Sequence, residues 1–457
     1  MIASRETAGR PTRIAQVGAF DIENLGDLLF PTLAERALAE RLGPVEIDPF
    51  SYHGRPAAGW PYAVRPLGEL IDAIDSYDLL LVGGGDTIRY DKQVLPGYEP
   101  ADPRLHHPTS LWLVPILLAA ANGVPIAWNA PGVVNEPPPW ALAPTRAALR
   151  ASDYVAVRDP ISASRLATVD GVTPLVVPDT AFAIRTHAPA EPGDGARALL
   201  AELGVDGPWV VLQAAPALAP AAARIDAAIG ALSERGIATI ELPISPVLGD
   251  RAGAIDRDLA TVSPASWPDP ATIVELVAGA RAVVATSLHL SIVAAALGVP
   301  VSRPELAGRA TKYEILRPLA GVHHWTLDAS GGQPIPIPIP LDPVPAVERP
   351  AELAARVGEH WDAVAGLLER RQPRGRAALT GLALAIPGAL EDLARAREED
   401  VRRLDAELDA ARAAADSLAD RVAAQERDLE QIRRSPSWRL TEPLRAIKSA
   451  ATGRRRT

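Results

Sequence analysis

The stretch Asp78-Leu-Leu-Leu-Val-Gly-Gly-Gly-Asp86 decides the fold of this 457-residue chain. Residues 79–82 form an unbroken apolar run without the polar alternation of a half-exposed strand, which is typical of a parallel strand buried on both faces. The three glycines that follow allow a ligand or another backbone to approach closely. We therefore expect a parallel sheet with a functional turn at the carboxyl end of this strand.

Strands and helices alternate on both sides of this segment. Upstream, the strand-like run 13–17 ends in Gly18 and leads through a turn into a helical pattern. Downstream the alternation continues to residue 157, and after the polar segment 188–195 (APAEPGDG) the same order begins again. This predicts an α/β fold of two doubly wound, Rossmann-like domains facing a cleft, residues 13–190 and 191–332.

The last third of the chain has a different character. Residues 333–346 are proline-rich and must be extended, and residues 347–390 are expected to form helices that pack back on the core. Within them, the apolar stretch 377–390 is either a docking helix or an interfacial one. Residues 391–434 predict a coiled coil and a homo-oligomer, the alternative being an amphipathic helix packed on its own domain. Its stripe has alternating spacings of three and four: Val401, Leu404, Leu408, Ala411, Ala415, Leu418, Val422, Gln425, Leu429 and Ile432.

The remaining segment, 435–457, is a basic tail. From Arg433 onward there are seven arginines and one lysine against a single acid, Glu442. Trp438 among these arginines suits an anionic membrane surface, so peripheral contact with the inner face of the plasma membrane is one interpretation. Docking of the tail on the same protein is the other.

Composition excludes several classes of function. The chain has no cysteine, and its eight histidines lack the spacing of metal ligands, so we expect no metal site. A formal net charge of −10 argues against nucleic-acid binding. The N-terminus lacks the apolar core of a signal peptide, and the longest apolar stretch, 111–128, is interrupted by Pro115 and Pro125. We expect a cytoplasmic protein.

Two turns are candidate sites for an anion. The segment 18–27 (GAFDIENLGD) joins a strand to a helix start, where backbone N–H groups and the helix dipole favour negative charge. The alternative is that its polar residues only make the turn and cap the helix. The substrate-binding candidates in these two turns are Asn24, Gly26, Asp27, Gly83, Gly84, Gly85 and Asp86.

Three further segments place polar residues at strand ends. Arg158 follows one strand and either faces the cleft or pairs with Asp159, and Asp179 ends another strand at the domain junction. The segment 283–289 (VVATSLH) places His289 just before or in the first turn of a helix, where an imidazole can transfer protons. A lone histidine is more often structural. The candidates here are Arg158, His289 and Lys312 for catalysis, and Asp179, Thr286 and Ser287 for substrate binding.

Taken in order, these segments resemble the polysaccharide pyruvyl transferase family over residues 13–325. The motifs are NLGD, DLLLVGGGD, VAVRDPISA, VVPDTA, and TSLH followed by AAALGVPV. The resemblance implies two facing Rossmann-like halves, as in GT-B-like nucleotide-sugar glycosyltransferases. It also implies phosphoenolpyruvate as donor, a ketal-linked pyruvate on a sugar as product, and no cofactor. The family histidine falls on His289, its arginine on Arg158 and a downstream basic residue on Lys312. Some members have arginine where this chain has Ser287, and others have serine.

The resulting hypothesis makes His289 the general acid or base, with Arg158 and Lys312 stabilising charge on the donor. The acceptor, a sugar or a lipid-linked glycan, stays open. A glycosyltransferase that uses a nucleotide sugar is the second hypothesis, and it needs a ribose-binding carboxylate for which Glu305 is the candidate. The third is a non-catalytic scaffold that acts through its coiled coil and tail. The segment 435–445 (SPSWRLTEPLR) is similar to a sequence near the ends of bacterial surface-glycan glycosyltransferases.

Overall fold

The computed structural model describes residues 10–91, 98, 100, 102–105, 108–169, 173–186, 193–256, 261–305, 310–327, 336–345, 350–369 and 375–441. Within these ranges the side chains of residues 186, 310–312, 375–390, 392, 439 and 440 are not described. The chain forms two units, Met1–Ala389 and Leu390–Thr457.

The first lobe of the larger unit is built on a parallel sheet with strand order β3-β2-β1-β4-β5. A small parallel sheet of β6 and β7 continues it through a bridge from Ala127 to Tyr154. The strands are β1 (Thr12–Val17), β2 (Val45–Ser51), β3 (Arg65–Pro66), β4 (Leu79–Val82), β5 (Ile126–Trp128), β6 (Ala156–Val157) and β7 (Leu175–Val176). The helices are α1 (Leu25–Leu42), α2 (Leu67–Ala73), η1 (Ile74–Ser76), α3 (Ser110–Asn122), α4 (Pro139–Ala151), α5 (Pro160–Leu166) and η2 (Thr180–Thr186).

The second lobe repeats this plan with another strand order, β12-β11-β10-β8-β9, again parallel throughout. Its strands are β8 (Trp209–Gln213), β9 (Ala238–Leu242), β10 (Val283–Val284), β11 (Val301–Glu305) and β12 (Val322–Thr326). Its helices are α6 (Asp194–Glu202), η3 (Pro216–Ala221), α7 (Ala222–Ser233), η4 (Pro246–Leu248), α8 (Pro270–Gly279), α9 (Leu288–Leu297) and η5 (Ala310–Leu316).

Each sheet has a switch point where the strand order reverses direction. It lies between β1 and β4 in the first sheet and between β8 and β10 in the second. In open parallel sheets, ligands bind outside the carboxyl ends of the strands at such points, because the loops there diverge to opposite faces. The turns after β1, β4 and β10 are three of the segments that the sequence singles out.

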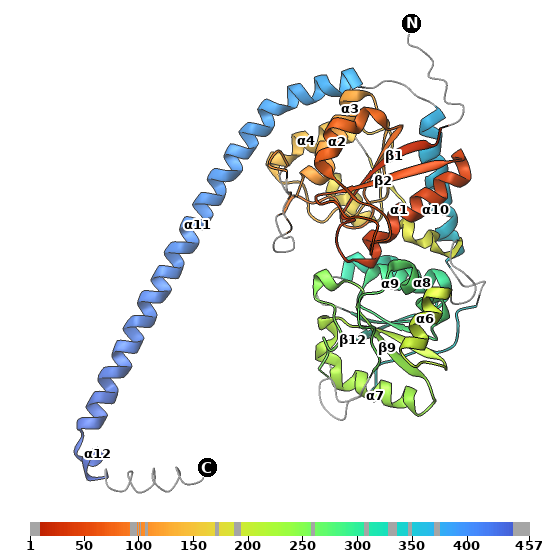
Figure 1. Ribbon diagram of the computed structural model, residues 1–457. Helices are drawn as coiled ribbons and strands as arrows, with labels where there is room; N and C mark the ends of the chain where they lie inside the picture. The colour runs from red at the N-terminus through yellow and green to blue at the C-terminus, as the bar shows by residue number, and fades with distance from the viewer. Residues whose placement is uncertain are drawn as a thin grey trace. The chain divides into compact units, whose positions relative to one another are not determined.

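One hydrophobic cluster spans the two lobes, and each lobe also has a cluster of its own. Leu28 of α1, Phe182 of η2 and Leu290 of α9 belong to the same buried cluster, although they lie far apart in the sequence. Figure 1 shows α8 and α9 on the side of the second sheet that faces the first lobe. Full burial of such a side chain stabilises by about 1.5–3 kcal/mol, so this shared cluster holds the facing turns in a common frame.

The late helix α10 (Ala351–Glu369) packs on the first lobe beside α1, as Figure 1 also shows. Arg41 of α1 pairs with Asp362 at 2.6 Å, and Trp361 is fully buried. The described part of the proline-rich segment forms neither helix nor strand and lies on the second lobe, where Val344 N–H donates to the Gly298 carbonyl at 3.1 Å.

The α/β class with parallel sheets and a C-terminal helix is confirmed. The sequence missed β2, whose residues Glu46, Asp48 and Pro49 interrupt the apolar run. Nevertheless β2 pairs with β1 on one side and with β3 on the other. β10 is short and consists of Val283 and Val284.

The C-terminal helix α11 runs without interruption from Gly375 to Arg434. The apolar stretch 377–390, expected as a docking or interfacial helix, lies within it. A short helix, α12 (Pro436–Leu440), begins the tail, and residues 442–457 lie outside the described part of the chain. Contact of the tail with a membrane therefore stays a prediction. Over the described residues, no helix combines the length and the apolar character needed to cross a bilayer.

Candidate active site

The NLGD turn starts α1 and is bonded to the second lobe. Asn24 is the N-cap, and its side-chain oxygen accepts from Gly26 N–H at 3.3 Å. The same oxygen accepts from the Ser245 hydroxyl at 3.2 Å, and Leu25 N–H donates to the Ile244 carbonyl at 3.1 Å. The capping role considered from sequence is therefore present. In addition, the cap fastens this turn to the loop after β9.

Gly26 lets the backbone of α1 approach the imidazole of His289. A Cβ atom at this position would lie 1.9 Å from His289 Nδ1, far inside van der Waals contact. Phe30, one turn further along α1, meets the same ring edge-on at a centroid separation of 5.4 Å. His289 lies in the first turn of α9, so two residues on one face of α1 enclose a side chain of the other lobe.

The three glycines after β4 adopt backbone conformations that side chains disfavour, with φ values of 92°, 103° and 66° for Gly83, Gly84 and Gly85. Their surroundings exclude a side chain as well. A Cβ would lie 2.4 Å from the Phe30 ring at Gly84 and 2.1 Å from the Asp27 carboxylate at Gly85. The glycine turn and the NLGD turn therefore lie against each other at the switch point of the first sheet.

A chain of alternating charges, buried except at the partly exposed Asp86, connects four of the five segments. Arg158 at the end of β6 bonds Asp86 of the glycine turn and also Asp159, the latter at 3.3 Å. Its Nη1 lies 3.9 Å from Asp179 Oδ2, and that oxygen lies 3.3 Å from His289 Nε2. The order is thus carboxylate, guanidinium, carboxylate, imidazole. The pairing of Arg158 with Asp159 exists, but it is only one of several.

These contacts shift the ionisation of the buried groups. Burial by itself lowers the pKa of Arg158, but Asp86, Asp179 and Asp159 outweigh it and raise that pKa above the ordinary value. For Asp179, burial raises the pKa, while His289 and then Arg158 lower it, with a net lowering. Arg158 and Asp179 are therefore charged at neutral pH, with Asp179 between two potential cations.

Three atoms at the centre of this chain lack a hydrogen-bond partner among the described residues: Arg158 Nη1, Asp179 Oδ2 and His289 Nε2. Each is buried, and although Asp179 Oδ2 lies within ion-pair distance of the other two atoms, neither contact has hydrogen-bond geometry. The bonding of such buried donors and acceptors is usually completed by a ligand or water. The cluster therefore has the properties of a binding site that holds donors and a proton carrier together.

At the switch point of the second sheet, Gln213 organises the turn that precedes His289. Its side-chain oxygen accepts from the N–H groups of Thr286 and Ser287 at 2.9 and 2.8 Å. Its amide donates to Asp250 at 2.8 Å. The Ser287 hydroxyl is the N-cap of α9 and accepts from Leu290 N–H at 3.3 Å. In this structure Thr286 and Ser287 therefore shape the turn that carries His289.

Arg303, which sequence reasoning missed, lies behind the same turn. It is fully buried in β11, donates to the Thr286 carbonyl at 2.9 Å and to the Ser291 hydroxyl at 3.1 Å, and stacks on Tyr313 at 3.6 Å. Burial lowers its pKa, and no carboxylate among the described residues pairs with it. It adds a positive charge beside Ser287, whose carbonyl accepts from its Nη1 at 3.4 Å.

Sequence signals for the missed residues existed but were weak. Arg303 interrupts an otherwise apolar strand, and arginine in such a strand is rarely buried without a specific role. Gly132 is the other case. A Cβ there would lie 2.6 Å from both Arg158 Nη2 and Asp86 Oδ1, so this glycine makes room for the charged pair. In the sequence, the only signal for this glycine is the proline that precedes it.

Two sequence candidates are not part of this cluster as described. The side chain of Lys312 lies outside the described residues, although its backbone falls in η5. Its role as a second cation over the site therefore stays a prediction. Glu305, the ribose-binding candidate of the glycosyltransferase hypothesis, pairs with Arg317 at 3.2 Å and is largely exposed.

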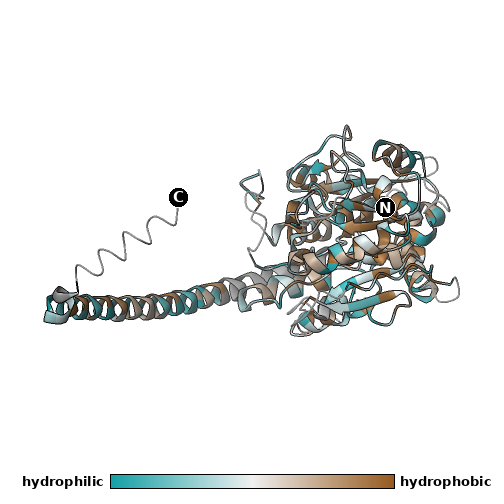
Figure 2. Ribbon diagram, turned by 90° about the horizontal axis from the view of Figure 1, so that it is seen from below, coloured by the Kyte–Doolittle hydropathy of each residue, from teal (hydrophilic) through white to brown (hydrophobic). Residues whose placement is uncertain are grey.

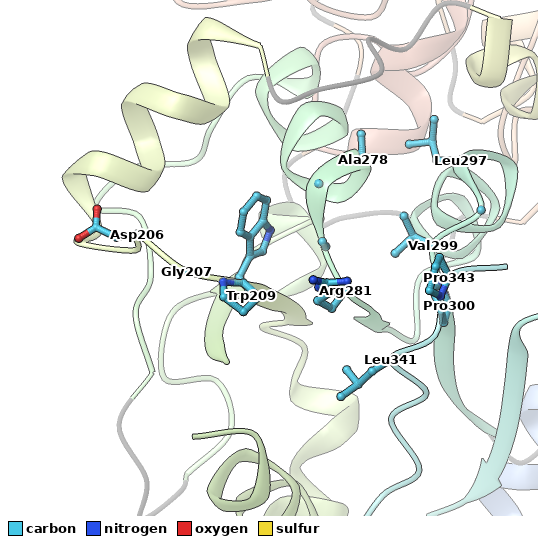
Figure 3. Close-up of a pocket in the computed structure, with 14 residues that line it drawn as sticks. Asp206, Gly207, Trp209, Ala278, Arg281, Leu297, Val299, Pro300, Leu341 and Pro343 are labelled. Carbon is cyan, nitrogen blue, oxygen red and sulfur yellow. The ribbon is translucent and has the colours of Figure 1, made fainter. Parts of the chain in front are cut away.

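A cavity of about 500 Å³ lies at the amino ends of the strands of the second sheet, away from the carboxyl ends where the candidate site lies. Trp209, Arg281, Val299 and Leu341 line it (Figure 3), and the first three lie at or just before the amino ends of β8, β10 and β11. His289 and Thr286 follow the carboxyl end of β10, so this cavity does not belong to the candidate site.

Over the described residues, no group of three or more histidine, aspartate, glutamate or cysteine side chains could hold a metal ion. The chemistry available from the described residues is therefore that of a buried imidazole, a guanidinium and carboxylates. Such a set can bind an anion and move a proton.

The family model for polysaccharide pyruvyl transferases matches residues 24–302, which is more than half of the chain. The chain belongs to the polysaccharide pyruvyl transferase family. It is therefore a transferase, and the resemblance read from the five segments is confirmed. The matched range includes all the catalytic and substrate-binding candidates of the pyruvyl transferase hypothesis except Lys312, and it ends just before Arg303.

The pyruvyl transferase chain is also similar to solved structures at low identity. The UDP complex of S. aureus MnaA is 11% identical with a TM-score of 0.42, covering 80% of this chain and 90% of that one. A UDP-GlcNAc 2-epimerase of Methanocaldococcus jannaschii is 14% identical with a TM-score of 0.45, covering 69% and 88%. A UDP-GlcNAc 2-epimerase of Neisseria meningitidis bound to UDP-GlcNAc is 12% identical with a TM-score of 0.40, covering 83% and 99%. None of the curated proteins compared with the chain matches it.

Proposed function

We propose that this enzyme transfers a pyruvyl group from phosphoenolpyruvate to a sugar of a cell-surface polysaccharide or of its precursor. The observation that carries the proposal is the contact of Asp179 with both Arg158 and His289, whose facing atoms have no hydrogen-bond partner among the described residues. Family membership supplies the reaction class, and this cluster supplies groups suited to it.

The reaction requires an anion site and a proton donor. A proton adds to the methylene carbon of phosphoenolpyruvate, which becomes a methyl group. Two sugar hydroxyl oxygens then bond to the central carbon, and the bond from that carbon to the phosphate oxygen breaks. Of the two hydroxyl protons, one balances the proton taken up by the methylene carbon and the other leaves with phosphate.

In the proposed mechanism His289 is the general acid or base. Asp179 faces its Nε2 at 3.3 Å, and a carboxylate in that position fixes the orientation of the ring. Phe30 and Gly26 enclose the ring and restrict its movement. A positioned imidazole contributes typically ~10²–10⁴-fold to such a rate.

Arg158 is the proposed anion-binding residue. Its Nη2 and Nε are bonded to Asp86 and Asp159, whereas Nη1 has no hydrogen-bond partner among the described residues and can donate to a carboxylate or phosphate oxygen. Three carboxylates keep it charged in a buried place, so it does not lose its proton when the donor is absent. The Lys312 side chain would add a second charge.

The test is phosphate release from phosphoenolpyruvate, with methyl glycopyranosides that carry free 4- and 6-hydroxyls as acceptor probes. We expect wild-type activity to fall ~10²–10⁴-fold in His289→Ala. His323→Ala, which alters an exposed histidine of β12, is the matched control and keeps full activity. UDP release from UDP-sugars without phosphate release from phosphoenolpyruvate would overturn the proposal in favour of a glycosyltransferase.

A further inference from the structure

The helix α11 carries an apolar stripe that faces solvent. Over the described part of unit Leu390–Thr457, the seven large apolar residues of the stripe from 401 to 432 are 47–58% exposed, and the other helix there, α12, has only five residues. Figure 2 shows hydrophobic and hydrophilic residues alternating along α11. The seven are Val401, Leu404, Leu408, Leu418, Val422, Leu429 and Ile432.

The stripe fits a heptad repeat with Val401 at position a and Leu404 at position d. Positions a and d recur to Ile432, a span of 32 residues, or about 48 Å of helix at 1.5 Å per residue. Alanines occupy two central positions and Gln425 occupies one d position. A stripe of this length and regularity is typical of a coiled coil rather than of a helix on the surface of a globular domain.

We propose that α11 forms a parallel, in-register coiled-coil dimer with the same helix of a second copy of this chain. A second copy is the expected partner because the charged residues on either side of the stripe can pair with those of an identical helix. In a parallel pair, each g residue lies beside the e residue of the next heptad on the other helix. Three of the five pairs are then of opposite charge, one is Ala414–Ala419, and one, Asp400–Asp405, is repulsive. The attractive pairs are Glu407–Arg412, Arg421–Glu426 and Asp428–Arg433.

The antiparallel alternative has poor charge pairing. With the stripes fully overlapped, Val401 of one helix faces Ile432 of the other, and g residues lie beside g residues, e beside e. This places Glu407 beside Asp428 and Asp405 beside Glu426, which are two repulsive pairs, and in either orientation every pair occurs twice by symmetry. The attractive pair is Glu398 with Arg433. Charge pairing therefore selects the parallel orientation.

Gln425 selects the same arrangement by a separate mechanism. In the parallel in-register dimer it faces Gln425 of the second copy, and two amides can hydrogen-bond to each other within the seam. In the antiparallel dimer it faces Leu408, which leaves a buried amide without a partner at a cost of about 1–3 kcal/mol. A single polar residue in the seam is a known way to specify register.

The first experiment measures the mass of the full chain in solution by sedimentation equilibrium. We expect a concentration-dependent species of twice the 48.2 kDa of one chain. Leu418→Glu introduces a charge into the seam and shifts the protein to a single chain at concentrations where the wild type is dimeric. Ala413→Glu introduces the same charge at an outward f position and keeps the dimer. A wild-type protein that is monomeric at all concentrations, a trimer, or a Leu418→Glu variant that stays dimeric would overturn the proposal.

The second experiment determines orientation and uses the absence of cysteine from the sequence. In the parallel dimer Leu404→Cys faces itself, so mild oxidation links two copies by a disulfide. In the antiparallel dimer it faces Leu429, so Leu404→Cys chains do not link with each other. A dimeric Leu404→Cys protein that stays unlinked, but links when mixed with Leu429→Cys chains, would refute the parallel orientation.

Discussion

Replacing Gly26 by alanine tests whether the close contact between α1 and His289 matters for catalysis. The added Cβ would lie 1.9 Å from Nδ1 and 2.3 Å from Cγ of the imidazole. Comfortable contact for such atoms is about 3.5 Å, so the ring or the helix must move by roughly 1.5 Å. Because a displacement of about 1 Å in a catalytic group can cost ~10²-fold, we expect kcat/KM to fall by about that factor.

The free energy of unfolding should fall by no more than about 2 kcal/mol in this variant. Alanine favours a helix over glycine by about 1 kcal/mol, while overpacking costs about 1–3 kcal/mol. The assay is therefore phosphate release from phosphoenolpyruvate beside a urea-unfolding curve on the same protein. Gly358→Ala in α10 is the matched control, since its nearest neighbour would be 3.8 Å away, and it keeps full activity. A Gly26→Ala enzyme with wild-type kcat/KM would refute the contact's role.

Three further predictions concern stability. Arg158→Met leaves buried carboxylates without their cation and should lower the free energy of unfolding by about 3–5 kcal/mol, and an unchanged urea midpoint would contradict this. Arg303→Lys keeps the charge but loses the bonds to the turn before His289, so we expect a loss of about 1–3 kcal/mol, and a lysine variant as stable as wild type would show that charge alone suffices. Burial lowers the pKa of His360 to about 3, so below pH 6.5 the unfolded chain binds a proton that the folded chain does not. Stability should therefore fall between pH 6.5 and 3 by up to about 1.4 kcal/mol per pH unit. His360→Gln should flatten this profile, and equal slopes for the two proteins in urea unfolding at several pH values would count against the assignment.

Local sequence patterns determine the α/β class. Apolar runs such as 79–82 are typical of strands that are buried on both faces of a sheet. Where a polar turn and a helical pattern follow such a strand, the combination indicates alternating strands and helices around a parallel sheet. The same reasoning located the turns after β1, β4 and β10. Glycines and helix-capping residues favour particular backbone conformations, so such turns can be recognised in a single sequence. β2 escaped this reasoning because its charged residues obscure the pattern, and tertiary pairing between two strands stabilises it regardless.

Partners within the site were not accessible to sequence reasoning. The alternative that Arg158 pairs with its neighbour Asp159 was open, and the structure adds Asp86 and Asp179, which are 72 and 21 positions away. Arg303 appeared only as an arginine in a strand. Which charges meet depends on how two separate sheets pack through a shared core, and no local pattern carries that information.

The chain's own sequence thus determined the alternating strands and helices, the glycine and NLGD turns, the heptad stripe and the family. Tertiary structure decided that Gly26 of one lobe closes on His289 of the other, and that Asp179 lies between an imidazole and a guanidinium. The physical reason is the separation along the sequence over which each interaction acts. Backbone preference and hydrophobic periodicity act over a few residues, whereas the contacts that shift a pKa or exclude a Cβ arise between segments that only folding brings together.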